Sequence, residues 1–185
     1  MTEQLGYPTF IGLVETFLKN SVKQIHLPGY SLISRRDRKD DSGWGGIAFF
    51  VKDAYRDVIV HAGNSEAAER SWHILHTDRG LVSICLWYRP PAPGEIASII
   101  SLTPEMETFA SGCVGTMIVG DMNVHHVGWL TYSSGTTPEG RELYSWCLGS
   151  GFEERVGKPT REEYLLDLAL TDGWKSLRSG RSWNF

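Results

Sequence analysis

The sequence predicts a mixed α/β protein of the α+β kind, a four-layer α/β/β/α sandwich in which two mixed sheets pack face to face and helices lie outside them. Short apolar runs typical of strands fill the first half of the chain. Helical spacing begins only near Ile96, and a strand-like run follows each later helical segment. This long series of strands before the first helix favours packed sheets over a doubly wound parallel sheet.

Apolar runs and alternating patterns define the expected strands, and turn residues separate them. The sixth run ends at Tyr88-Arg89-Pro90-Pro91, where the prolines stop sheet pairing. The strands are expected at Phe10–Val14, Tyr30–Arg36, Ile47–Val51, Arg56–His61, Ser71–His76, Leu81–Tyr88, Gly115–Gly120 and Tyr164–Leu170.

Helical segments are expected between the later strands. Isoleucines recur at helical spacing from Ile96 to Ile100. Thr103 followed by proline predicts the N-cap of a second short helix. Thr137 followed by proline predicts a third helix, which ends near Gly151.

Length and composition predict one domain, residues 1–185, with a real hydrophobic core. The chain has no apolar run of about 18 residues, so no membrane span is expected. Its three cysteines are odd in number and widely spread, which favours a reducing, intracellular compartment. The net charge of −4 argues against a protein that coats polyanions. Arginines, a lysine and aspartates alternate over residues 35–41, which predicts a solvated surface loop.

The stretch from Met117 to His126 has the clearest chemical pattern. Apolar residues end at Gly120, and Asp121 and Asn123 follow. In extended backbone these two side chains point to the same side. A carboxylate beside a carboxamide suits a hard cation and an attacking water. The alternative is that this segment only turns the chain after a core strand, because these residue types favour turns.

Further polar residues stand within or at the ends of apolar runs. Besides Asp121 and Asn123 they are Glu15, Tyr88 and Asp167. A carboxylate inside a buried strand is costly unless it is paired or binds a metal ion. The group as a whole therefore predicts a site in which carboxylates act together.

Four motifs with this order and spacing carry a resemblance to a known family. In chain order they are Val14-Glu15-Thr16, Leu86-Trp87-Tyr88-Arg89-Pro90-Pro91, Gly120-Asp121-Met122-Asn123-Val124-His125-His126 with Trp129, and Pro159-Thr160-Arg161 followed by Leu166-Asp167-Leu168. The chain resembles the endonuclease/exonuclease/phosphatase superfamily, and within it the endonuclease domain of non-LTR (LINE-type) retrotransposons. The resemblance extends over nearly the whole chain.

The resemblance implies a role for each matching residue. Glu15 would ligate Mg²⁺ or Mn²⁺, and Tyr88 would donate its hydroxyl to the scissile phosphate. Asp121 would act on the water or the leaving group, while Asn123 would orient the phosphate. Asp167 would orient a catalytic histidine. The remaining matching residues would support the site or contact the substrate, and they are Thr160, Arg161, His125 and Trp129.

Two family motifs have no match in this sequence. No asparagine precedes Glu15, and no histidine follows His126. The resemblance therefore implies a domain that lacks its terminal strands, and Asp167 would orient a histidine that is absent. Because a catalytic base or donor is typically worth about 10²–10⁴-fold in rate, we expect a weak or inactive nuclease.

The resemblance also implies partners and leaves alternatives open. DNA is the expected substrate, a reverse transcriptase is a candidate partner in a longer polyprotein, and a monomer with no membrane contact is expected. An intracellular location is expected, with the nucleus as one option. The alternatives are a phosphoesterase of the same superfamily that acts on small molecules, and a non-catalytic relic of a mobile element that binds metal or nucleic acid. A zinc site of Asp121, His125 and His126 is disfavoured because adjacent histidines point apart.

Overall fold

In the computed structural model, which describes residues 8–38, 43–160 and 165–172, the first three strands form an antiparallel sheet. They are β1 (Phe10–Val14), β2 (Tyr30–Arg36) and β3 (Ile47–Lys52), with β3 in the centre. The start of β3 pairs with the ends of both neighbours, because Ile47 lies opposite Val14 and opposite Arg36. All three strands therefore contribute to the same edge of the sheet.

The second sheet has six strands in the order β4-β5-β6-β7-β9-β8. Adjacent strands of this sheet pair antiparallel, except for β6 and β7, which are parallel. The strands are β4 (Ile59–Asn64), β5 (Glu69–Thr77), β6 (Gly80–Tyr88), β7 (Gly115–Asp121), β8 (Glu153–Glu154) and β9 (Asp167–Thr171). The sheet is mixed, as predicted.

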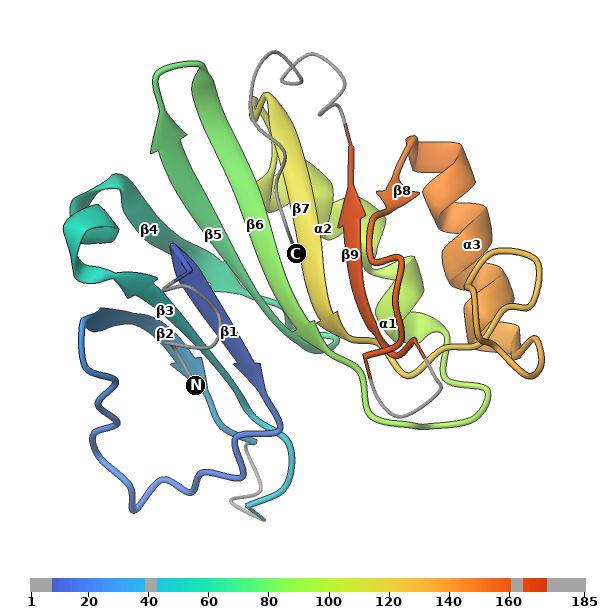
Figure 1. Cartoon of the computed structure of the whole chain (residues 1–185), viewed down its shortest axis with the longest axis horizontal. Coiled ribbons are helices and arrows are strands. Elements are labelled where there is room, and N and C mark those ends of the chain that lie inside the picture. Colours follow the sequence, from blue (N-terminus) through green and yellow to red (C-terminus); the bar gives the residue numbers. More distant parts are fainter. Residues whose placement is uncertain (1–7, 39–42, 161–164, 173–185) are drawn as a thin grey trace.

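Helices cover the far face of the six-stranded sheet, away from the three-stranded sheet (Figure 1). They are α1 (Ala97–Ile100), α2 (Leu102–Phe109) and α3 (Pro138–Ser150). One core lies between the two sheets and includes Phe49 and Ile84. A second core joins the six-stranded sheet to the helices through Trp72, Ile99 and Leu143. Within the described residues, no helix has the length and apolar character that a membrane crossing needs.

The predicted α+β class with two packed sheets is confirmed, and one outer layer takes a different form. Extended chain and turns, residues 15–29, cover the outer face of the three-stranded sheet, where Ile25 and Leu27 pack against Tyr30 and Phe50. Ile25 and Leu27 are two residues apart, so both reach the sheet from extended backbone. Pro28-Gly29 then turns the chain into β2.

Two local predictions in this part of the fold need correction. Residues 53–58 form a short 3₁₀ helix, η1 (Asp53–Val58), so the strand expected from Arg56 begins only at Ile59. Helix α2 begins at Leu102, so Thr103 is not its N-cap. Tyr164, the expected start of the last strand, lies outside the described residues. By contrast, the side chain of Thr137 caps α3 as predicted, accepting a hydrogen bond from the Gly140 amide at 3.1 Å.

In the charged run at residues 35–41, Arg35 and Arg36 belong to β2, so the strand prediction is correct for them and the loop prediction is wrong. The Arg36 guanidinium donates hydrogen bonds to the carbonyl oxygens of Ser65, Ala68 and Arg70. This side chain therefore ties the end of β2 to the β4–β5 turn. Local charge pattern did not indicate that role, because the acceptors are backbone atoms about 30 residues away.

His73 on β5 is fully buried between the two sheets. Its ring stacks on Phe49 at 4.0 Å, and its Nε2 lies 2.7 Å from the Ser34 hydroxyl. Burial lowers the pKa of His73 from 6.5 to about 3, although its contact with the Ile84 carbonyl acts in the opposite direction. The imidazole is therefore neutral in the folded protein at neutral pH.

We expect acid to destabilise the fold through His73. Between pH 6.5 and about 3 the unfolded chain binds a proton that the folded chain does not, so stability is full above pH 6.5 and falls as the pH drops. Within this range the free energy of unfolding should fall by about 1.4 kcal/mol for each pH unit. Urea unfolding between pH 7 and pH 4 measures it. His73→Leu removes this slope, and His76→Leu, at an exposed position of the same strand, keeps it. Equal slopes in wild type and His73→Leu would contradict the assignment.

Candidate active site

Strand direction brings four of the predicted residues to one edge of the two-sheet sandwich. Tyr88 and Asp121 are the last residues of the parallel strands β6 and β7. Asp167 is the first residue of β9, which is antiparallel to β7. Glu15 follows β1 in the other sheet and reaches Tyr88 through a hydrogen bond. Residues from all parts of the chain thus meet at the same place.

Tyr88 and Glu15 form a direct contact between the two sheets. The Tyr88 hydroxyl donates to Glu15 Oε1 at 2.8 Å, and the tyrosine is only 4% exposed. Burial raises the pKa of Tyr88, and the hydrogen bond to Glu15 and the charges of Glu15 and Asp121 raise it further. The phenol therefore keeps its proton at neutral pH and remains a hydrogen-bond donor.

Asp121 still belongs to β7, but the backbone leaves the extended conformation by Asn123, so the expectation of extended backbone through both residues is wrong. Asn123 has a φ of 45°, and its amide donates to Asp121 Oδ1 at 3.1 Å. The side-chain amide of Asn123 donates to the Arg89 carbonyl at 2.8 Å. The turn hypothesis and the site hypothesis are therefore compatible, because the turn itself holds the two side chains at the sheet edge.

Asp167 lies directly opposite Asp121 in the β7–β9 register. Two carboxylates in this position repel each other unless a proton or a cation lies close to them. The Thr160 hydroxyl accepts hydrogen bonds from the backbone amides of Leu166 and Asp167, at 3.2 and 3.0 Å, and so holds the start of β9. Arg161 lies outside the described residues.

Arg89 braces this edge, a role that the sequence did not reveal. The residue is 2% exposed, its amide donates to the Asp121 carbonyl, and its guanidinium donates to the carbonyls of Ala92 and Glu95. Its charge is paired with Glu95 at 3.5 Å and Glu139 at 3.9 Å. The available signal was a charged residue placed between an apolar strand and two prolines.

His125 and Trp129 lie on the α3 side of the turn. The Trp129 ring packs against Tyr144 of α3 at 5.4 Å, and His126 packs against the same tyrosine at 4.6 Å. The His125 carbonyl accepts from the Thr137 amide, and a Cβ on Gly140 would lie 2.0 Å from that oxygen. These contacts anchor the loop to α3, and contact of His125 or Trp129 with substrate remains a prediction.

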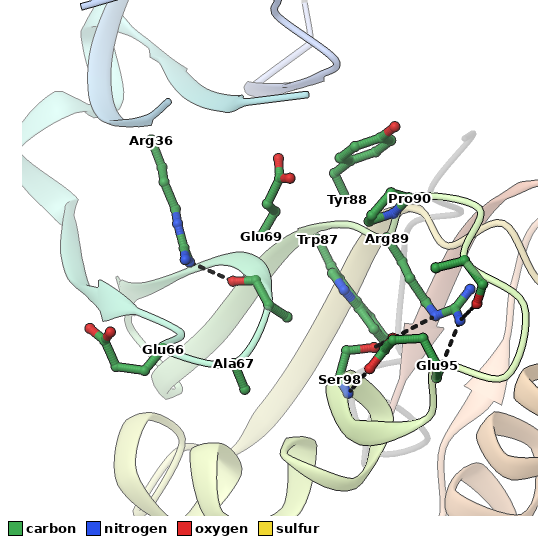
Figure 2. A pocket seen from close by; sticks show the side chains of 12 residues that line it. Arg36, Glu66, Ala67, Glu69, Trp87, Tyr88, Arg89, Pro90, Glu95 and Ser98 are labelled. Carbon is green, nitrogen blue, oxygen red and sulfur yellow. Dashed lines mark hydrogen bonds and ion pairs between the residues drawn. The ribbon is translucent and has the colours of Figure 1, made fainter. Parts of the chain in front are cut away.

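A pocket of about 320 Å³ opens beside Tyr88 (Figure 2). Arg36 and Glu69 line one side, and Arg89 and Glu95 line the other. Charged groups of both signs therefore surround it, next to Tyr88, which is predicted to donate a hydrogen bond to phosphate. The described residues contain no cluster of three or more His, Cys, Asp or Glu side chains that could hold a metal ion by themselves.

The two-sheet architecture is similar to that of several solved structures, including two with TM-scores above 0.5. One is the endonuclease domain of TRAS1, a telomere-specific non-LTR retrotransposon, with a TM-score of 0.56 and 14% identity over 78% of this chain. Another is the human Nocturnin catalytic domain with bound sulfate anion, with a TM-score of 0.58 and 12% identity over 92% of this chain. At these identities the likeness concerns the fold.

The chain spans 65% of the TRAS1 domain, slightly less than two thirds, and 72% of the Nocturnin domain. No protein-family model and no curated protein sequence matches it.

Proposed function

We propose that this chain hydrolyses phosphodiester bonds with the help of a divalent cation, and that its substrate is DNA, which it nicks as a retrotransposon-type endonuclease domain does. The observation that carries the proposal is the meeting of Glu15, Tyr88 and Asp121 at one sheet edge, with Asp167 opposite Asp121. The fold, shared with a retrotransposon endonuclease domain, supports the same chemistry.

The donor set fits a loosely held Mg²⁺ or Mn²⁺. Such an ion usually keeps several waters and binds one or two carboxylates together with substrate phosphate. Glu15 supplies one carboxylate, and the opposed pair of Asp121 and Asp167 gives the edge a concentration of negative charge. A bound cation would polarise a phosphoryl oxygen and offset the charge that develops during displacement.

The protein's own groups would orient the reaction. Tyr88 keeps its proton, so its hydroxyl can turn from Glu15 to a phosphate oxygen. Asp121 would accept a proton from the attacking water or act at the leaving group. One amide hydrogen of Asn123 is used by the Arg89 carbonyl, which leaves the second free to orient a phosphate oxygen.

We expect low turnover, because no histidine follows Asp167 in the sequence and no asparagine precedes Glu15. In a plasmid-nicking assay with protein in excess and Mg²⁺ or Mn²⁺, the wild-type chain should relax supercoiled DNA slowly. Asp121→Ala should lower the rate at least about 100-fold, to background. Asp57→Ala is the matched control, because Asp57 is an exposed carboxylate of η1.

Three outcomes would contradict the proposal. Nicking that survives Asp121→Ala would indicate a contaminating nuclease. Nicking that EDTA leaves unchanged would exclude the divalent cation. Plasmid binding without nicking, equal in the wild type and in Asp121→Ala, would instead identify a non-catalytic nucleic-acid-binding domain.

A further inference from the structure

Two large aromatic side chains project into solvent beside the candidate active site. Phe17 is 49% exposed and Trp44 is 67% exposed. Their rings lie edge to face, with centroids 5.9 Å apart and planes at 90°. Exposed aromatic area is unfavourable in water, and neighbouring exposed aromatic side chains often mark a binding surface.

The backbone holds this aromatic pair in place without burying it. The Thr16 amide donates to the Gly46 carbonyl at 3.1 Å, and the Phe17 amide donates to the Gly45 carbonyl at 2.9 Å. The backbone φ lies in the left-handed region, which residues with side chains rarely adopt, at Phe17 (53°), Gly45 (65°) and Gly46 (87°). A Cβ on Gly46 would lie 2.5 Å from the Thr16 hydroxyl, so glycine is needed for this close approach.

Charged side chains brace the two segments from the outside. The Arg35 guanidinium donates to the carbonyls of Lys19 and Val22 and so holds the segment that follows Phe17. Glu69 accepts from the Gly46 amide at 2.8 Å and pairs with Arg38, which holds the turn that follows Trp44. Backbone strain kept in a tightly braced loop is typical of functional surfaces.

The aromatic pair stands next to the residues that would handle phosphate. Phe17 lies two residues after Glu15, which contacts Tyr88, and Trp44 lies three residues before β3, whose first residue pairs with Val14. The side chain of Lys19 lies along Gly43, the residue before Trp44, so its ammonium group is close to the aromatic pair. An exposed aromatic surface with an adjacent cation is the combination that binds single-stranded nucleic acid, in which bases stack and phosphates meet positive charge.

We propose that Phe17 and Trp44 form a stacking platform for a nucleobase of a strand whose phosphate lies at the Glu15–Tyr88 contact, with Lys19 on a neighbouring phosphate. Trp44, the more exposed ring, takes the base, and Phe17 supports the indole from its side. The platform favours unpaired or locally opened DNA over intact duplex, because a paired base keeps its faces covered. The inference rests on the proposed function for its substrate class.

The test is equilibrium binding of a short fluorescent single-stranded oligonucleotide, followed by anisotropy in EDTA so that no hydrolysis takes place. Trp44→Ala should raise the Kd about 10-fold, and Trp44→Phe should keep it within about 3-fold of wild type, because a base still stacks on the phenyl ring. Lys19→Ala should reduce the slope of log K against log salt by about 0.7. Tyr55→Ala is the matched control, because Tyr55 is 46% exposed on η1, beyond the opposite end of β3.

Unchanged affinity in Trp44→Ala, or an equal loss in Tyr55→Ala, would overturn the proposal. So would a wild-type chain that does not bind the oligonucleotide, which would leave the platform to a protein partner. The nicking assay is independent of this result. Platform-dependent binding without nicking would refute only the proposed catalysis, and Asp121-dependent nicking with platform-independent binding would refute only the platform.

Discussion

Replacing Glu105 by alanine is expected to lower the free energy of unfolding by about 3–5 kcal/mol, which is the usual cost of leaving a buried charge without its partner. Glu105 of α2 meets Arg70 of β5, whose side chain has no exposed surface, with Arg70 Nη2 2.8 Å from Glu105 Oε1. The same carboxylate accepts from Trp72 Nε1 at 2.8 Å and from the Ser65 hydroxyl at 2.5 Å. Without this carboxylate, the buried donors of Arg70, Trp72 and Ser65 all lose their shared acceptor.

In the part of the chain that the structure describes, Glu105 is the only carboxylate that forms an ion pair with Arg70. Its guanidinium lies 4.6 Å from the centre of the Trp87 ring, and its other donors reach the Ser98 carbonyl and the Ser101 hydroxyl. Hydrogen bonds to neutral acceptors do not replace a carboxylate. We therefore expect the loss to appear as a lower midpoint in urea with an unchanged m-value.

Two variants sharpen this test. Glu107→Ala, at an exposed position of the same helix, should change stability by less than about 0.5 kcal/mol. The double variant Arg70→Met with Glu105→Leu should recover part of the lost free energy of unfolding, because an apolar pair of similar volume leaves no unpaired charge at position 70. A Glu105→Ala protein as stable as wild type would show that the network does not hold α2 to the sheet.

Replacing Gly120 by alanine is expected to destabilise the fold by about 3 kcal/mol or more, through strain and overpacking together. Gly120 has a φ of 140°, and a Cβ there would lie 1.9 Å from the Trp87 carbonyl oxygen. That oxygen belongs to the backbone of β6, so relief requires the parallel strands β6 and β7 to separate. Because Asp121 follows immediately, the candidate site should lose its geometry as well.

Thermal or urea unfolding measures the effect of Gly120→Ala. Gly149→Ala is the matched control, because this glycine lies within α3 and its Cβ position has no described atom within 4 Å apart from its chain neighbours and the backbone of the helix itself. Alanine there should stabilise the helix by about 0.5–1 kcal/mol. Opposite signs at the two glycines are the expected result, and equal small effects would show that β6 and β7 tolerate the extra atom.

Much of the secondary structure, and the choice of several candidate site residues, could be predicted because the signals are local. The strand periods placed β1 and β2 at the residues where they occur, and Thr137 with its proline placed the start of α3. Polar residues at the ends of apolar runs singled out Glu15, Tyr88 and Asp121 before any contact between them was known. Errors arose at Arg56 and Thr103, where local patterns suited more than one structure.

The sequence by itself singled out the candidate site residues, because strand period, capping and the cost of an isolated carboxylate act over a few neighbours. Only the tertiary structure decided how those residues meet. Tyr88 and Glu15 are 73 residues apart, and their contact depends on the packing of one sheet against the other. The brace at Arg89, the neutral imidazole of His73 and the exposed platform of Phe17 and Trp44 likewise follow from burial and strand pairing, which join segments distant along the chain.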